Sequence, residues 1–279
     1  MNPAPRDAGA RKGIPLRAII PNAVTALALC TGLTGVRFAI AEDWAYAVYA
    51  VVAAGVLDGL DGRIARALKG QSKFGAELDS LADVISFGVA PALILHLWSL
   101  QHWPRMGWVF ALSYAVCMAL RLARFNARID AEDQPHKSAG FLTGVPAPAG
   151  AGLILLPMIL WIASGETWDW LRDYWVVAPW AALIAFLGIS SLATFSWTSL
   201  RLRRSVRFEA IVVIALLGGA LVSAPFETLS VVALLYLALI PFSVLSYARV
   251  RRRRAAAVPP RPSPLARDPQ QNGSASDGP

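Results

Sequence analysis

Residues 56–90 read VLDGLDGRIARALKGQSKFGAELDSLADVISFGVA, and this stretch decides how the rest of the chain is interpreted. It contains four aspartates, Asp58, Asp61, Asp79 and Asp83, which lie inside or at the edge of apolar runs. A carboxylate within a membrane span is costly and is usually retained for a function. We therefore expect these aspartates to form a functional site.

The composition of the whole chain indicates a polytopic membrane protein. Its 279 residues are 56% hydrophobic and only 16% charged, and they include ten tryptophans. The apolar residues cluster into runs that each approach the ~20 residues needed to cross a bilayer as a helix. These runs cover residues 19–40, 44–57, 84–100, 107–120, 144–164, 175–198, 210–224 and 229–248. We predict an all-α fold, a bundle of about eight transmembrane helices.

Lysine and arginine are concentrated in alternate segments between these runs, and basic loops stay on the cytoplasmic side. The basic segments are the N-terminus, the connections after the second, fourth and sixth runs, and the sequence after the eighth. This pattern predicts that both termini and the aspartates face the cytoplasm, in a multi-pass protein of the cell (inner) membrane. The net charge of +8 then reflects contact with anionic lipid headgroups, and we expect no nucleic-acid partner.

The chain divides into three segments. Residues 1–15 are polar and rich in Pro, Ala and Gly, which predicts a flexible cytoplasmic N-terminus. Residues 16–250 form the predicted transmembrane domain. Residues 251–279 start with a basic run and continue with many Pro, Ala and Ser residues, so we expect a disordered cytoplasmic tail. Pro91 and Pro157 lie inside apolar runs and predict kinks in the membrane helices.

The aspartates form two pairs at helical spacing. Asp58 and Asp61 are three residues apart, and Asp79 and Asp83 are four apart, so each pair lies on one face of a helix. The connection at residues 67–75 is short and polar, and two helices that it joins should be antiparallel neighbours. All the carboxylates are then expected to converge at the cytoplasmic end of the two helices.

Carboxylates that share a small volume repel one another unless cations neutralise them. Hard oxygen ligands suit Mg²⁺ or Mn²⁺, so a metal site is one interpretation. The alternative is a network of interfacial ion pairs with Arg63, Arg66 and Lys69. The regular spacing favours the metal site, as do Gly59 and Gly62, which would let a ligand approach the helix closely.

The signature Asp58-x-x-Asp61-Gly62-x-x-Ala65-Arg66, followed after eight residues by Gly75-x-x-x-Asp79-x-x-x-Asp83, resembles that of the CDP-alcohol phosphatidyltransferases. No position of the signature, which spans residues 58–83, departs from it. The resemblance implies a membrane enzyme that transfers a phosphatidyl group from a CDP-linked lipid to an alcohol and releases CMP. It also implies a homodimer.

The resemblance also assigns roles to individual residues. Asp58, Asp61 and Asp79 are expected to hold a two-metal centre, and Asp83 to contribute to metal binding and to accept the proton of the alcohol. The remaining contacts belong to the CDP portion of the substrate: Gly62 and Arg66 touch it, Ser72 lies where a loop hydroxyl is often found, and Gly75 leaves room for it.

Elementary chemistry agrees with these roles. Attack on a pyrophosphate requires that its negative charge be neutralised and its leaving group stabilised, and two divalent ions about 3.5–4 Å apart supply both effects. A hydroxyl is a weak nucleophile near neutral pH, so a carboxylate placed as general base is needed as well.

Three further segments resemble the phosphatidylserine synthase branch of this family: FGAELDSLADVISFGVAPALIL, ALRLARFNAR and GFLTGVPAPAGAG. They imply CDP-diacylglycerol as donor and L-serine as acceptor. Glycerol 3-phosphate or an inositol remains an alternative acceptor. A divalent-cation transporter is a more distant alternative, although the chain shows neither midplane carboxylates nor inverted repeats.

Two other groups of residues are candidates for substrate contacts. Asn22 and Thr25 follow Pro21 near the cytoplasmic end of the first run, where they present side-chain oxygens to the site or cap a helix that starts at Pro21. Arg121, Arg124 and Asn126 lie at the cytoplasmic end of the fourth run. One of these arginines is expected to hold the serine carboxylate, and ordinary anchoring at the membrane surface is the alternative.

Overall fold

The computed structural model describes residues 16–127, 141–143, 145–190, 193–195 and 207–257. These residues are almost entirely helical, which confirms the predicted all-α class. They also contain one small addition that the sequence did not predict. Strands β1 (Phe141–Thr143) and β2 (Ala193–Phe195) pair in antiparallel register, with Leu142 opposite Thr194.

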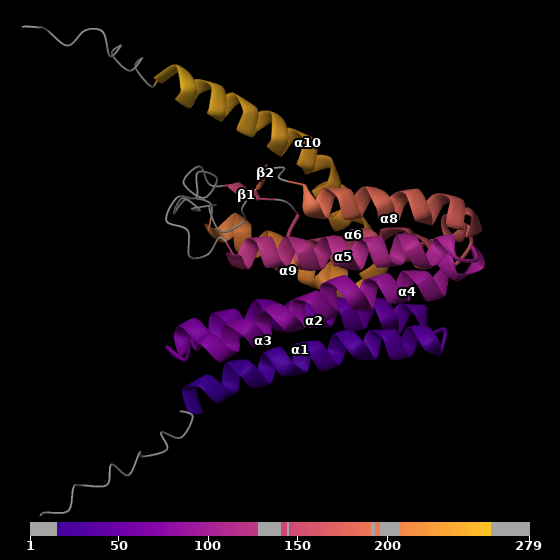
Figure 1. The fold of residues 1–279 in the computed structure, drawn as a ribbon, viewed down its shortest axis with the longest axis horizontal. Coiled ribbons are helices and arrows are strands. Elements are labelled where there is room, and N and C mark those ends of the chain that lie inside the picture. The colour runs from indigo at the N-terminus through magenta and orange to yellow at the C-terminus, as the bar shows by residue number, and fades with distance from the viewer. Residues whose placement is uncertain (1–15, 128–140, 144, 191–192, 196–206, 258–279) are drawn as a thin grey trace, which may run out of the picture.

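Most helices follow one another along the chain with short connections, and longer segments separate α5 from α6 and α8 from α9 (Figure 1). The first half contains α1 (Leu16–Ile40), α2 (Trp44–Ala67), α3 (Lys73–Asp83), the π-helix η1 (Val84–Val89), α4 (Ala90–Trp98), the 3₁₀ turn η2 (Leu100–His102) and α5 (Met106–Ala127). The second half contains α6 (Ala147–Ile154), α7 (Leu156–Ala163), the 3₁₀ turn η4 (Asp169–Arg172), α8 (Tyr174–Ile189), α9 (Arg207–Ser223) and α10 (Pro225–Ala257).

Among the described residues, five helical segments are long and apolar enough to cross a membrane. They are Ile19–Ile40, Trp44–Ala67, Lys73–Trp98, Met106–Ala127 and Pro225–Phe242. The other three predicted spans correspond to shorter helices: α6 and α7 together, α8, and α9. The third span begins earlier than predicted, because α3, η1 and α4 follow one another without a loop.

Most of the helices run roughly along one long axis, with α1 at one edge of the bundle and α10 slanting away from the others (Figure 1). Helix α1 packs along much of α2 and also contacts α3, η1 and α4, whereas α2 and α3 make few direct contacts with each other. The predicted neighbours are therefore held together mainly through a third helix. In the rest of the bundle, α5 packs against α8.

Pro91 lies directly after η1, and its effect on the helix is local. Proline has no N–H, so it cannot donate a hydrogen bond to the carbonyl four residues earlier, which belongs to Phe87. Tyr114 of α5 supplies the donor, and its hydroxyl lies 3.0 Å from the Phe87 oxygen. The predicted kink takes the form of a π-helix that a neighbouring helix supports.

A neighbouring helix also contacts the chain at Pro157, where α6 ends and α7 begins. The carbonyl four residues earlier belongs to Leu153, and the Trp180 indole N–H donates to it at 2.9 Å. The predicted kink is therefore a break between two short helices, and the Leu153 carbonyl accepts from a backbone N–H at the C-cap of α6 as well as from the Trp180 indole of α8.

Two predicted boundaries were wrong. Helix α1 begins at Leu16, so Pro21 lies inside the helix and does not start it. Helix α10 extends to Ala257, so residues 251–257, which were assigned to the disordered tail, are helical. The predicted flexible N-terminus (1–15) and the rest of the tail (258–279) lie outside the described residues.

Candidate metal and nucleotide site

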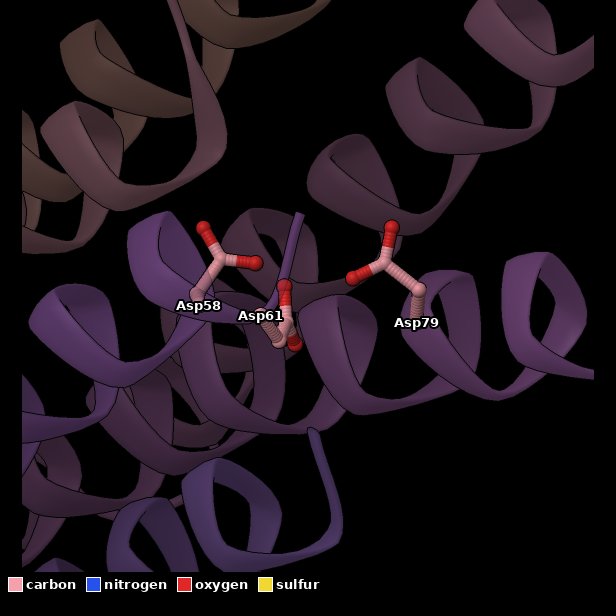
Figure 2. A group of neighbouring side chains, drawn as sticks. All are labelled: Asp58, Asp61 and Asp79. Atoms are coloured by element: carbon pink, nitrogen blue, oxygen red, sulfur yellow. The ribbon is translucent and has the colours of Figure 1, made fainter. Parts of the chain in front are cut away.

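Helices α2 and α3 bring three of the aspartates together (Figure 2). Asp58, Asp61 and Asp79 each offer a carboxylate oxygen, and these oxygens all lie within 4.8 Å of one another. In Figure 2 the three carboxylates turn toward a common space, with Asp61 between the other two. Three convergent carboxylate oxygens match the donors that hard divalent cations prefer, so this trio can hold a divalent metal ion.

Asp83 lies outside this trio but adjoins it. It is the last residue of α3, and its carboxylate is within hydrogen-bonding reach of the Asp58 carboxylate. The π-helix η1 begins at the next residue, and π-helical turns are often found at functional sites. Asp58 therefore connects the trio to a fourth carboxylate, that of Asp83.

The expected alternative, a network of ion pairs, is not what the structure shows. Among the described side chains, none of the four aspartates lies within 4.0 Å of a cationic nitrogen of Arg63, Arg66 or Lys69. All three cationic residues are exposed. The negative charges of the cluster therefore have no cationic partner among these side chains.

A cavity of about 310 Å³ opens beside the trio. Asp61 and Asp79 line it, so the cavity and the candidate metal site share a wall. The other predicted site residues that line it are Asn22, Thr25, Gly62, Arg66, Ser72 and Gly75. The cavity thus brings together residues of α1, α2 and the α2–α3 connection that were predicted separately from the sequence.

Gly75 is tightly enclosed in this cavity. A Cβ atom at position 75 would lie 2.7 Å from Asn22 Oδ1 and 3.1 Å from Ser72 Oγ. Ser72 is the N-cap of α3, and its Oγ accepts a hydrogen bond from the Gly75 N–H at 3.0 Å. The glycine therefore lets Asn22 and Ser72 reach the same part of the wall.

The glycines of α2 behave differently. A Cβ atom at Gly59 would have no neighbour within 4 Å, and one at Gly62 would meet only Arg66 Nη1 at 3.8 Å. These glycines do not accommodate another helix. They leave open space along α2 between the aspartates and Arg66, as the prediction of close ligand approach requires.

Thr25 and Asn22 enter the site from α1. The Thr25 hydroxyl is 2.6 Å from Asp61 Oδ2, and both side chains are buried. Neither residue caps α1, because the helix begins at Leu16. The sequence placed both residues near the site, but Thr25 and Asp61 are 36 positions apart, so their direct contact could not be predicted from local spacing.

The residues from the end of α5 lie in different surroundings. Arg121 is half-buried, and it lies within electrostatic range of Asp83. Arg124 is exposed, and its Nη1 donates to the carbonyl of Ile189 at the end of α8. Asn126 donates to Ser80 Oγ at 2.8 Å, so it ties α5 to α3 next to Asp79. Of these two arginines, Arg121 is thus the one within electrostatic range of Asp83.

Sequence reasoning missed Tyr114 and Ser80, whose hydrogen bonds hold the elements next to the aspartates in place. Tyr114 is fully buried and holds η1 through the Phe87 carbonyl, and Ser80 receives Asn126. The one available signal was Pro91, which implies that a carbonyl needs another donor. Nothing in the sequence indicated which residue supplies it.

The model of the CDP-alcohol phosphatidyltransferase family matches residues 18–187, which include the trio, Asp83 and every described residue of the cavity wall. A second model, CDP-alcohol phosphatidyltransferase 2, matches residues 206–241. The first match alone covers more than half of the chain.

Three curated proteins to which the chain is similar share the name CDP-diacylglycerol–serine O-phosphatidyltransferase. The Mycobacterium bovis protein is 40% identical over 85% of this chain and 81% of its own length. The Mycobacterium leprae protein is 39% identical over 81% of this chain and 74% of its own. The Helicobacter pylori protein is 40% identical over 51% of this chain and 58% of its own. With the signature, the aspartate trio and the family match in agreement, this chain belongs to the CDP-alcohol phosphatidyltransferase family of enzymes.

Proposed function

We propose that this enzyme transfers the phosphatidyl group of CDP-diacylglycerol to the hydroxyl of L-serine, which yields phosphatidylserine and CMP. The observation that carries the reaction class is the wall shared by the aspartate trio and the cavity, which Asp61 and Asp79 both line. The names of the similar proteins support serine as the acceptor.

Asp58, Asp61 and Asp79 would hold the metal centre, with Asp83 contributing from the Asp58 side. We assign two ions to it, Mg²⁺ or Mn²⁺, because four carboxylates leave more negative charge than one divalent ion neutralises. When bound, such ions neutralise the diphosphate and stabilise the leaving CMP.

The protein's own groups would handle the proton and the substrate. Asp83 accepts the proton of the serine hydroxyl as general base. The hydroxyl oxygen forms a bond to the phosphorus that bears diacylglycerol, and the bond from that phosphorus to the bridging oxygen breaks, so CMP leaves. Asp83 suits this role because it adjoins the metal ligands without belonging to the trio.

The cavity would hold the nucleotide. Arg66 is exposed on its wall, and its guanidinium can donate several hydrogen bonds to a diphosphate. Gly62, Ser72, Gly75 and Asn22 complete the wall next to it. Arg121 would bind the serine carboxylate, since it lies on α5 within electrostatic range of Asp83. Arg124 and Asn126 would contribute by holding α5 against α8 and α3.

We also propose eight membrane passes, a cytoplasmic active site and both termini in the cytoplasm of a cell (inner) membrane protein. In support, the start of α1, the α2–α3 connection and the end of α10 lie at the same end of the bundle (Figure 1). Three tryptophans are exposed, as an interfacial belt requires. Trp168 lies in the turn between α7 and η4, Trp170 in η4 and Trp175 in α8. A homodimer is proposed from the family resemblance.

A panel of acceptors tests the proposal. The purified protein would be given CDP-diacylglycerol, Mn²⁺ and, in separate reactions, serine, glycerol 3-phosphate or inositol, and CMP release would be measured. We expect release with serine alone. Release that depends on another alcohol would keep the reaction class and overturn the acceptor.

A further inference from the structure

We propose that Thr25 is a positioning residue for the metal centre: its hydroxyl fixes the orientation of the Asp61 carboxylate from α1. The inference rests on the metal centre of the proposed function but not on the identity of the acceptor alcohol. It also differs from the sequence-based expectation, in which Thr25 contacts the substrate.

The hydrogen bond between Thr25 and Asp61 is short and enclosed. The two oxygens are 2.6 Å apart, and the side chains are only 5% and 4% exposed. Thr25 Oγ1 also lies 3.1 Å from the Pro21 carbonyl of its own helix. A hydroxyl has one hydrogen, and a charged carboxylate at the shorter distance is the stronger acceptor. The hydrogen of Thr25 therefore points to Asp61.

The packing of α1 sets the position of this hydroxyl. The buried residues Thr25, Ala28, Gly32 and Gly35 follow a spacing of three and four, so they lie along one face of α1. A Cβ atom at Gly32 would lie 2.7 Å from Ser86 Oγ, and one at Gly35 would lie 3.2 Å from the carbonyl oxygen of Ala47. These close contacts with η1 and α2 fix the rotation of α1, and the rotation directs Thr25 at Asp61.

This arrangement has a consequence for metal binding. Asp61 is the most buried member of the trio, and Thr25 donates a side-chain hydrogen bond to its carboxylate. A donor that holds one carboxylate oxygen leaves the other available to a cation in a preset direction. Outer partners of this kind typically contribute about 10- to 100-fold to metal affinity.

The test measures Mn²⁺ affinity of the full-length protein in detergent, by electron paramagnetic resonance of free Mn²⁺, for T25V, T25A and T25S. Valine keeps the branched shape of threonine without the donor, and serine keeps the donor. T31V and T34V are matched controls, because the hydroxyls of Thr31 and Thr34 donate only to carbonyls of α1, each at 2.7 Å. Thermal unfolding in EDTA checks that each variant is folded.

We expect T25V and T25A to weaken Mn²⁺ binding by about 10- to 100-fold, and T25S, T31V and T34V to bind like the parent. If T25V does not fold, the comparison of T25A with T25S decides. Unchanged Mn²⁺ affinity in the variants without the donor overturns the inference, and a raised KM for CDP-diacylglycerol in them would assign Thr25 to the substrate instead. A parent that binds no Mn²⁺ overturns the metal centre and this inference together. A parent that binds Mn²⁺ but does not use serine overturns only the acceptor.

Discussion

Asp58 and Asp83 come from different helices, yet their carboxylates lie within hydrogen-bonding reach of each other. Asp58 also belongs to the trio whose oxygens lie within 4.8 Å of one another, whereas Asp83 does not. The cluster is therefore divided into a group suited to a cation and a neighbouring carboxylate suited to a proton. This division leads to different expectations for the individual aspartates.

The substitution Asp83→Asn should separate binding from turnover. An amide keeps the shape of the side chain but cannot act as a base, so kcat should fall by about 10²- to 10⁴-fold. Mn²⁺ and CDP-diacylglycerol should still bind. Asp58→Ala and Asp79→Ala should instead lose Mn²⁺ binding as well. CMP release by Asp83→Asn at close to the parent rate would remove this residue from the role of base.

Gly75→Ala should disturb the nucleotide pocket. The new methyl group would lie 2.7 Å from Asn22 Oδ1, so Asn22 must move away from the cavity wall. We expect a higher KM for CDP-diacylglycerol and an unchanged KM for serine. Gly152→Ala is the matched control, because a Cβ atom at that position of α6 meets nothing within 4 Å. Equal effects of the two substitutions would argue against a specific role for Gly75.

Arg121 and Arg124 should differ in their effect on serine. Arg121 lies within electrostatic range of Asp83, so Arg121→Ala should raise the KM for serine and leave the KM for CDP-diacylglycerol near that of the unsubstituted protein. Arg124→Ala removes a hydrogen bond to the Ile189 carbonyl and should leave the serine KM unchanged. If neither substitution changes the serine KM in steady-state assays, the carboxylate has another partner.

Tyr114→Phe tests the support of the π-helix. It removes the donor to the Phe87 carbonyl, and an unsatisfied buried carbonyl costs about 1–3 kcal/mol of the free energy of unfolding. A lower unfolding temperature is expected, with a reduced kcat because η1 directly follows Asp83. Tyr46→Phe serves as the control, since that ring is 59% exposed. Equal stability of the two variants would show that the Phe87 carbonyl does not depend on Tyr114.

The aspartate site could be predicted from sequence because its members occur in two local pairs. The spacing of each pair follows from helix geometry, and the short connection at 67–75 returns the chain to the same end of the bundle. The cavity wall followed from the same short stretch, since Gly62, Arg66, Ser72 and Gly75 lie between the two pairs. Local patterns therefore gave most of the site.

The contribution of α1 could not be predicted in the same way. The contact between Thr25 and Asp61 depends on the rotation of α1 against α2, which packing at Gly32 and Gly35 determines. The side-chain donors to Phe87 and Leu153 likewise come from helices distant in the sequence. The hydropathy pattern also failed to show that the run at 144–164 is two short helices, because hydropathy does not report where a backbone turns.

The most direct test of the account follows labelled serine into lipid. Purified protein would be incubated with CDP-diacylglycerol, Mn²⁺ and radiolabelled serine, and the label in the lipid fraction would be compared with the CMP released. We predict equal amounts of the two products, and neither product with Asp79→Ala. CMP release without labelled lipid, or labelled lipid formed equally well by Asp79→Ala, would contradict the account.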